Sequence, residues 1–238
     1  MVTSSTYRQA SIETPASRER DPFNKLFARQ SRYRLDAEFV RDNALSIGGL
    51  LSPKIGGESV KPYQPLGYWA ALNFPVREWQ KDTGEKTYRR GMYTHWQRTF
   101  PHPAMIAFDA STREECTAER PRSNIPQQAL VLLNDPEFVE AAKAFAVKSL
   151  GAGKDDAARI AWIFEKATGR APKAEEAKIL LGVLAKHRTE FAAKPTDAAK
   201  LLAVGEAKVP AKMSPVEMAS WTSVCRVVLN LHETITRQ

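Results

Sequence analysis

The densest group of chemically versatile side chains lies at residues 113–124, where the sequence reads Arg-Glu-Glu-Cys-Thr-Ala-Glu-Arg-Pro-Arg-Ser-Asn. These twelve residues contain three arginines, three glutamates and one cysteine. Arginine forks bind carboxylates and phosphates, and neighbouring cations favour the reactive thiolate form of a cysteine. One hypothesis is therefore a site that binds an anion or a partner. Its candidate residues are Arg113, Cys116, Arg120, Arg122 and Asn124.

The same stretch also has a structural interpretation, which the mixture of charges favours. The arginines would pair with Glu114, Glu115 and Glu119 in a buried network that fixes the loop to the helices, and Asn124 would satisfy backbone groups. If Arg120 is such a buried partner, its replacement with alanine destabilises the fold by roughly 2–4 kcal/mol, because a carboxylate is left unpaired. The two interpretations differ in whether the arginines converge on an open pocket or on the glutamates.

Two histidines, His95 and His102, raise the question of a metal site with neighbouring carboxylates. Their spacing fits no His-x3-His pair on a helix, prolines lie on both sides of His102, and no His-Glu-x-x-His motif occurs. We therefore expect no metal site. We expect His95 to face an aromatic layer of Tyr93 and Trp96, and His102 to lie on a loop. His95 is kept as a candidate binding residue beside the arginines.

A pair of glycines occurs in the segment Lys-Ile-Gly-Gly-Glu-Ser at residues 54–59. Paired glycines let backbone N–H groups approach a phosphate closely. The segment lacks the spacing of a P-loop and its terminal Gly-Lys-Ser/Thr, so a turn is the simplest interpretation. The sequence also contains no Gly-x-Ser-x-Gly nucleophile elbow, which excludes an α/β-hydrolase.

Helix signals are strongest in the second half of the chain. The run Asn134-Asp135-Pro136-Glu137 is typical of a helix start, because aspartate caps the helix and proline fits its first position. The run Ser214-Pro215-Val216-Glu217 has the form of a capping box. Apolar spacing and end signals predict helices at residues 35–51, 86–100, 134–150, 155–168, 172–193 and 214–234.

Long connecting segments separate these helices. Residues 52–87 are rich in proline, glycine and aromatic side chains, residues 104–124 lack periodicity, and residues 192–212 resemble a mobile insertion rich in alanine and lysine. No convincing alternating strand occurs, so the expected class is all-α: a bundle-like helical domain with long ordered loops. We expect an Arg- and Trp-rich loop-and-helix part at residues 1–124 and a helical C-terminal part of the same domain at residues 125–238.

Composition limits the classes of function. The formal net charge is +8, but both signs are interleaved and no basic run occurs, so nucleic acid is not an expected partner. No stretch approaches the roughly 20 apolar residues of a membrane span, and no signal peptide is visible. The absence of a Cys-x-x-Cys-His motif means that no covalent haem is encoded here. We expect Cys225, which lies in an apolar helical pattern, to be part of the core.

Several phrases of the sequence resemble one family. They lie at residues 4–11, 34–38, 54–65, 93–99, 108–136 and 229–233. Together they resemble the planctomycete PSD-one domain, a domain of unknown function that accompanies cytochrome c modules. The chain departs from the family phrase Thr-Asn-Thr-Pro at Ser123-Asn124-Ile125-Pro126, where Ile125 has lost a hydroxyl. This difference argues against chemistry by a hydroxyl group at that position.

The resemblance implies a context but no established activity. Met1 is expected to lie inside the domain, so that the chain is its C-terminal part. The upstream domain of the same protein, or a partner chain, is the expected partner. Haem is expected only on a separate upstream domain, with no cofactor in this chain. The resemblance also implies an extracytoplasmic location, in the periplasm or at the cell surface.

Two hypotheses for function follow. The leading one is a non-catalytic module for interaction or assembly within a larger extracytoplasmic, cytochrome-associated protein. The competing one is an enzyme or redox component whose site is shared with an upstream region. It would use Cys116, His95 and the cluster of Arg113, Arg120 and Arg122. Whether the chain is an enzyme is left open by the sequence.

Overall fold

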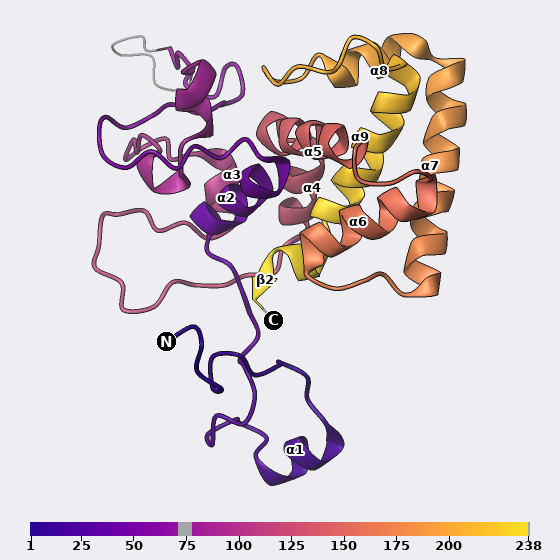
Figure 1. The fold of residues 1–238 in the computed structure, drawn as a ribbon. Coiled ribbons are helices and arrows are strands. Elements are labelled where there is room, and N and C mark those ends of the chain that lie inside the picture. The colour runs from indigo at the N-terminus through magenta and orange to yellow at the C-terminus, as the bar shows by residue number, and fades with distance from the viewer. Residues whose placement is uncertain (71–77, 238) are drawn as a thin grey trace.

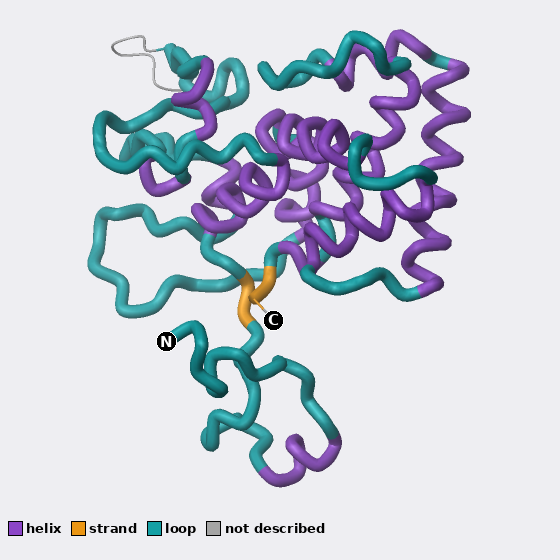
Figure 2. The backbone as a smooth tube through the Cα atoms, viewed as in Figure 1, coloured by secondary structure: helices purple, strands orange, loops and turns teal. Residues whose placement is uncertain are grey.

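The computed structural model describes residues 1–70 and 78–237. Figure 1 shows a helical body and an N-terminal segment, residues 1–32, that projects from it; we call this segment the arm. The described residues contain nine α-helices and one two-stranded sheet, so the expected all-α class is confirmed. Long loops connect the helices on one side of the body (Figure 2). The division at residue 124 stays a prediction.

Two buried helices form the centre of the body: α5 (Pro136–Ser149) and α9 (Pro215–Leu229). Phe145 on α5 and Trp221 on α9 are fully buried, as are the alanines at positions 141, 142 and 146. These small side chains let neighbouring helices approach α5 closely. The helices around this pair are α2 (Ala37–Gly48), α4 (Pro126–Asn134), α6 (Asp156–Thr168), α7 (Ala174–Ala193) and α8 (Pro195–Leu202).

The helix expected at residues 35–51 is confirmed as α2, which crosses α5 at very short range. A Cβ atom on Gly48 would lie only 2.7 Å from the carbonyl oxygen of Ala141. The helix then ends at Gly49, whose φ of 76° is readily adopted only by glycine. The glycine pair therefore both permits the contact between helices and ends α2.

The ends of α5 and α6 follow the signals in the sequence. The side chain of Asp135 accepts the backbone N–H of Glu137 at 2.9 Å, and Asp155 caps α6 in the same way. Gly169 ends α6 with a φ of 78°. The helices expected at residues 134–150, 155–168 and 172–193 are thus confirmed as α5, α6 and α7. No helix within the described ranges is both long and apolar enough to cross a bilayer.

The prediction of a mobile insertion at residues 192–212 is wrong for its first half, which is helical. Pro195 opens α8, and this helix packs against α9 with Ala198 fully buried. A composition of alanine and lysine indicates an exposed helix surface as readily as a mobile segment, since both residues are good helix formers. The buried Ala198 and the partly buried Leu202 attach this helix to the body.

Two side chains of α5 hold the segment that follows α8. Lys143, only 1% exposed, donates hydrogen bonds to the carbonyl oxygens of Leu202 at 3.1 Å and Val204 at 2.5 Å. Glu140, only 4% exposed, accepts the backbone N–H of Ala207 at 2.5 Å. Lys143 thus satisfies a carbonyl group that the C-terminal end of α8 leaves unpaired, and Glu140 satisfies an N–H group of the segment that follows.

The prediction of a single helix at residues 86–100 is also wrong. Two 3-10 turns occur there instead, η1 (Gly84–Tyr88) and η2 (Gly91–Tyr93). A Cβ atom on Gly91 would lie 3.0 Å from the Cα atom of Glu38 on α2, so the chain is pressed against that helix. A short helix, α3 (Pro103–Ala107), follows in a stretch that was expected to be irregular.

The expected capping box at the start of α9 does not form. Ser214 precedes the helix but makes no side-chain capping bond. Glu217 instead accepts a hydrogen bond from the indole of Trp221 at 2.8 Å and pairs with Arg188 of α7. The helix ends at Leu229 rather than near residue 234, and the 3-10 turn η3 (His232–Thr234) follows it.

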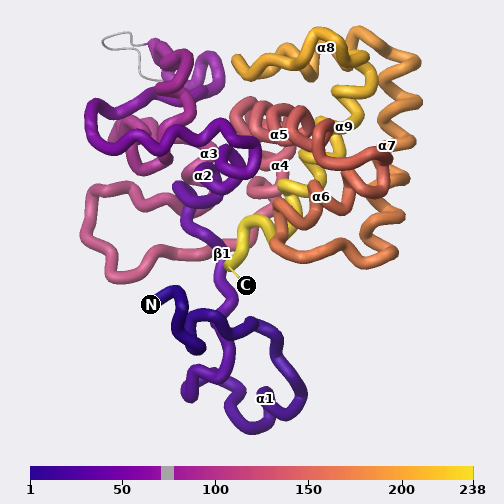
Figure 3. The backbone as a smooth tube through the Cα atoms, viewed as in Figure 1, coloured from indigo at the N-terminus to yellow at the C-terminus, as the bar shows by residue number. Residues whose placement is uncertain are grey.

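The arm joins the body where two short strands meet. Strand β1 (Tyr33–Arg34) pairs antiparallel with β2 (Thr236–Arg237), and Figure 3 shows this junction between the arm and the C-terminal end of the chain. The guanidinium group of Arg237 lies 5.3 Å from the ring of Tyr7 and 5.7 Å from the ring of Tyr33. The sheet and these stacked rings together fix the root of the arm.

Candidate functional site

The loop that carries most of the predicted binding residues is closed at its base by one carboxylate. Asp109 has a φ of 59° and accepts hydrogen bonds from the backbone N–H and the hydroxyl of Ser123, both at 2.8 Å. Arg34 of β1 pairs with the same carboxylate at 2.5 Å. Residues 110–122 therefore leave and re-enter the body at one point, and Figure 1 shows them as a wide excursion. This role of Asp109 was not predicted from the sequence.

The three arginines of the loop do not share a partner. Arg113 lies 4.5 Å from the ring of Trp96, and Arg122 lies 5.0 Å from the ring of Tyr33. Such placements allow cation–π attraction while the charged group stays in water. Residues 112–119 are exposed throughout, so the interpretation as a buried network with the loop glutamates is wrong.

Arg120 pairs with α2 instead of with its own loop. Its guanidinium donates to the carboxylate of Glu38 at 2.7 Å and lies 3.9 Å from Asp36. The hydrogen bond to Glu38 raises the pKa of Arg120 above its usual value. The Arg120 side chain nevertheless keeps 35% of its surface exposed, so water screens the pair.

We expect Arg120→Ala to lower the free energy of unfolding by no more than about 1 kcal/mol, because exposed ion pairs contribute little. This is less than the loss expected for a buried partner. Urea unfolding of the unchanged protein, of Arg120→Ala and of Arg98→Ala measures the difference, since the Arg98 side chain, which pairs with Glu114, is 80% exposed. A loss well above that of Arg98→Ala would show that Arg120 acts as a buried anchor.

The two cysteines have different surroundings and are not joined. Cys116 is exposed on the loop, and Asn124 is exposed near its end. Cys225 is fully buried in α9, as expected for a core residue, and this burial raises the pKa of its thiol. The loop cysteine therefore remains accessible to reagents, whereas Cys225 is shielded from them.

The side chains of the two histidines contact residues outside the arginine loop. The ring of His95 lies 5.9 Å from that of Trp79 rather than on the rings predicted, and its Nδ1 lies 3.4 Å from the hydroxyl of Ser59. His102 precedes α3 and is only 1% exposed, with Nε2 2.8 Å from the carbonyl oxygen of Tyr63. Burial lowers the pKa of His102. Within residues 1–70 and 78–237, no three His, Cys, Asp or Glu side chains are grouped as metal ligands.

A buried ion pair that the sequence did not reveal connects α2, α5 and η1. Arg41 is 3% exposed and donates to both carboxylate oxygens of Glu137, at 2.9 and 3.0 Å. It also donates to the carbonyl oxygens of Thr87 and Arg89, each at 2.7 Å. Burial, followed by the charge of Glu137, raises the pKa of the adjacent Asp135 to about 7. Arg41 thus uses its donors to join three elements.

A cavity of about 10 Å³ lies beside this pair, lined by Arg41, Glu137 and His102. The buried Nδ1 of His102 has no hydrogen-bond partner among the described residues. The volume is enough for about one water molecule and too small for a substrate. The cluster therefore has a structural role in joining the helices.

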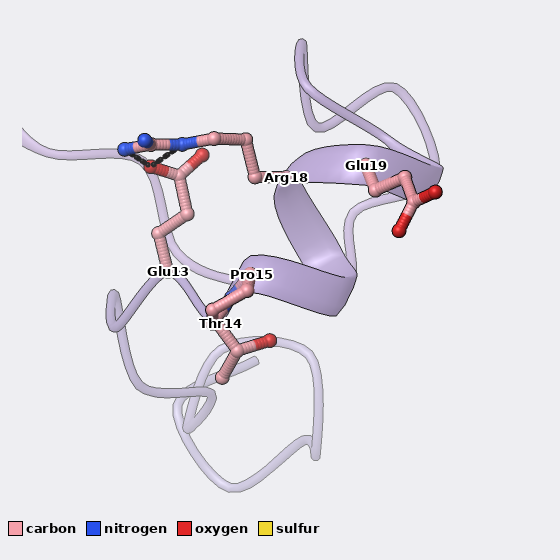
Figure 4. Close-up of a pocket in the computed structure, with 5 residues that line it drawn as sticks. All are labelled: Glu13, Thr14, Pro15, Arg18 and Glu19. Atoms are coloured by element: carbon pink, nitrogen blue, oxygen red, sulfur yellow. Dashed lines mark hydrogen bonds and ion pairs between the residues drawn. The ribbon is translucent and has the colours of Figure 1, made fainter.

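A larger hollow, of about 380 Å³, lies on the arm (Figure 4). It forms around the first turn of α1 (Pro15–Arg20), where Thr14 caps the helix. Glu13 points toward Arg18 across the hollow and pairs with it at 2.8 Å. This pair is internally neutral, so the charge that the hollow offers to a ligand is that of Glu19 alone.

Comparison with known proteins assigns the chain to a family. The sequence model of PSD1, described as a protein of unknown function (DUF1553), matches residues 1–184. The chain belongs to the PSD1 family. No curated protein and no solved structure matches it.

The PSD1 match contains the arm, the arginine loop and the Arg41–Glu137 pair, and it ends within α7. Helices α8 and α9 lie beyond the match, although α9 forms half of the buried centre. The description of PSD1 names no activity, so a proposal for function must rest on the chemistry of the surface.

Proposed function

We propose that this PSD1 chain is a non-catalytic interaction module of a larger extracytoplasmic, cytochrome-associated protein. In this proposal the arm docks on a separate folded domain, which belongs to the upstream part of the same protein or to a partner chain. One observation carries the proposal: a preformed turn in the arm holds three large apolar side chains in water. They are Phe23, Leu26 and Phe27.

Hydrogen bonds form this turn before any partner is bound. The carboxylate of Asp21 accepts the backbone N–H groups of Lys25 at 2.9 Å and Leu26 at 2.7 Å. The side chain of Asn24 donates to the carbonyl oxygen of Arg29 at 2.6 Å and accepts its N–H at 3.2 Å. Because the backbone is already fixed, docking loses less conformational entropy than it would for a disordered segment.

The apolar side chains of the turn have no core to enter. Phe23 is 81% exposed, Leu26 72% and Phe27 70%. Within the arm only Ser11 and Asp21 are buried, and both are polar. Burial of a large apolar side chain is favourable by about 1.5–3 kcal/mol, so a partner surface that covers all three would gain substantially.

Charge indicates the chemistry of the partner. Residues 1–32 contain six Lys and Arg against three Asp and Glu, a net charge of +3. The rest of the chain has a net charge of +5, so a second copy would present charge of the same sign. A hollow of about 260 Å³ beside Phe23 is lined in part by Arg29 and Arg32. These features favour a partner domain with an apolar groove bordered by carboxylates.

A photo-crosslinker tests this docking in the full-length protein in its native cells. p-Benzoylphenylalanine replaces Phe23 in one variant and Ile179 in a matched control, because Ile179 is 65% exposed on α7, away from the arm. We expect the arm variant to label one domain that mass spectrometry identifies and the control to leave that domain unlabelled. Equal labelling by both variants, or labelling only of a second copy of this chain, would contradict the proposal.

The identified domain is then purified for a measurement of affinity. Phe23→Ala combined with Leu26→Ala should weaken binding by at least about tenfold, and added salt should weaken it further. Ile179→Ala serves as the control and should leave the affinity unchanged. An unchanged affinity in the double variant would show that the arm does not form the interface.

The competing hypothesis, an enzyme or redox component, relies on Cys116, His95 and the loop arginines. In the structure Arg120 contacts Glu38 of α2, whereas His95 lies beside Trp79. Cys116 is on the exposed part of the loop. No observation on these groups favours shared chemistry over docking by the arm.

A further inference from the structure

A pocket of about 230 Å³ lies between the Gly56-Gly57 turn and η1. Arg89 lines this pocket, although only 5% of its surface is exposed. Its guanidinium donates to the carbonyl oxygens of Glu58, at 2.8 Å, and Gly56, and its plane lies 3.9 Å from the ring of Tyr93. These contacts hold Arg89 in place at one wall of the pocket.

The charge of Arg89 has no counterion within the described part of the chain. No carboxylate there lies within 4 Å of its guanidinium, and its buried Nε has no hydrogen-bond partner. A buried charge is normally paired with an opposite charge, because its removal from water is unfavourable. Carbonyl oxygens offset part of this loss but leave the full positive charge of Arg89 in the wall of the pocket.

Two further cations border the same space. Lys54 and Lys86 are exposed, and neither forms an ion pair among the residues that the structure describes. Glu58 and Glu85 also line the pocket, which leaves a net charge of +1. Glu85 is already engaged as the acceptor of a hydrogen bond from Ser52 at 2.7 Å.

The turn and a hydroxyl complete the wall. Gly57 of the turn lines the pocket, and its φ of 88° is a backbone conformation that favours glycine. Ser59 also lines the pocket and offers a hydroxyl donor. The donors at the pocket therefore comprise two ammonium groups and a hydroxyl, beside the positive charge of Arg89.

We propose that this pocket binds a small tetrahedral oxyanion, a phosphate or sulfate group, either free or as the ester of a small molecule. The volume accommodates such a group with a few attached atoms, and the oxyanion supplies the charge that Arg89 lacks. Charge-assisted hydrogen bonds to phosphate are among the strongest that side chains form. The site is separate from the arm and does not depend on the docking proposed above.

Titration calorimetry of the whole chain at low ionic strength tests the site. The probes are inorganic phosphate, inorganic sulfate and phenyl phosphate, with acetate as a planar monoanion for comparison. We expect one saturable site with a Kd of roughly 1 mM for phosphate and weaker binding of acetate. Tighter binding of phenyl phosphate than of phosphate would identify the ester as the preferred form, whereas equal or weaker binding would identify the free ion.

Two double variants distinguish binding of phosphate at this pocket from general attraction of an anion to a basic protein. Lys54→Gln with Lys86→Gln should weaken phosphate binding by about tenfold. Lys166→Gln with Lys178→Gln removes the same charge from exposed lysines of α6 and α7 and should leave binding unchanged.

Removal of a carboxylate from the pocket should change the affinity for phosphate in the opposite direction. Glu58→Gln should tighten phosphate binding by about threefold, because one negative charge leaves the pocket. Absence of saturable binding up to roughly 50 mM phosphate would overturn the proposal. An equal loss in the two paired-lysine variants would overturn it as well.

Discussion

Arg41→Ala should lower the free energy of unfolding by about 3–5 kcal/mol, because it leaves the carboxylate of Glu137 buried without a counterion. It also removes the donors to the carbonyl oxygens of Thr87 and Arg89, which hold η1 against α2. Typical domains are stable by only about 5–15 kcal/mol. The variant should therefore unfold at a much lower urea concentration than the unchanged protein.

An exposed arginine with two carboxylate partners provides the control for Arg41. Arg170 pairs with Glu176 and with Glu233, each at 2.7 Å, but its side chain is 34% exposed. Arg170→Ala should lower the stability by less than about 1 kcal/mol, since water screens both pairs. Equal losses in the two variants would show that the number of partners, and not burial, determines the contribution.

Gly205→Ala should lower the free energy of unfolding by about 2–5 kcal/mol. Its φ of 73° is unfavourable by about 1–2 kcal/mol for a residue with a Cβ atom. The new atom would also overlap the carboxylate of Glu140, and forcing atoms into a packed site destabilises by about 1–3 kcal/mol. Glu140 cannot move away freely, because it accepts hydrogen bonds from the segment after α8 and from Tyr88 at 2.7 Å.

Other glycines separate the two contributions at Gly205. Gly169 has a φ of 78° with open space around it, so Gly169→Ala measures the backbone effect alone. Gly182 lies within α7 with nothing near a Cβ atom, and Gly182→Ala should stabilise the helix by about 0.5–1 kcal/mol. The overlap itself is measured by a double-mutant cycle with Glu140→Ala. If the loss from Gly205→Ala is unchanged in that background, the overlap is not its cause.

Helix ends were the most predictable part of this fold. Asp135, Asp155 and Gly169 act through groups within one turn of themselves, so their effects depend on local sequence alone. The capping box at Ser214 failed because its fourth residue, Glu217, found stronger partners in Arg188 and Trp221. A local signal is reliable only where no distant side chain competes for the same atoms.

Long-range contacts account for the elements that the sequence did not reveal. Residues 86–100 have helical spacing, but Gly91 is pressed against α2 and Arg41 takes the carbonyl oxygens of η1. α8 is held by Lys143 of α5, which lies about 60 residues earlier in the chain. Spacing along one segment carries no information about such partners.

The side chains of the candidate site were also difficult to predict, because their partners lie far away in the sequence. A dense group of charges at residues 113–124 predicted a single site or a single network, yet Arg113, Arg120 and Arg122 contact three different segments of the chain. Arg41 was unremarkable in the sequence because its partner Glu137 lies 96 residues away. Density of charge along the chain is a poor guide to density in space, because loops spread their side chains over distant surfaces.

The pairing of β1 with β2 has a consequence for the newly made chain. The partners of Tyr33 and Arg34 are Arg237 and Thr236, so about 200 residues must be synthesised before the root of the arm can close. At 5–20 residues per second, translation leaves this root open for roughly 10–40 s. The turn that displays Phe23 emerges from the ribosome within that interval. The arm can therefore contact chaperones or a partner domain during translation, before the pairing of β1 with β2 fixes its orientation relative to the body.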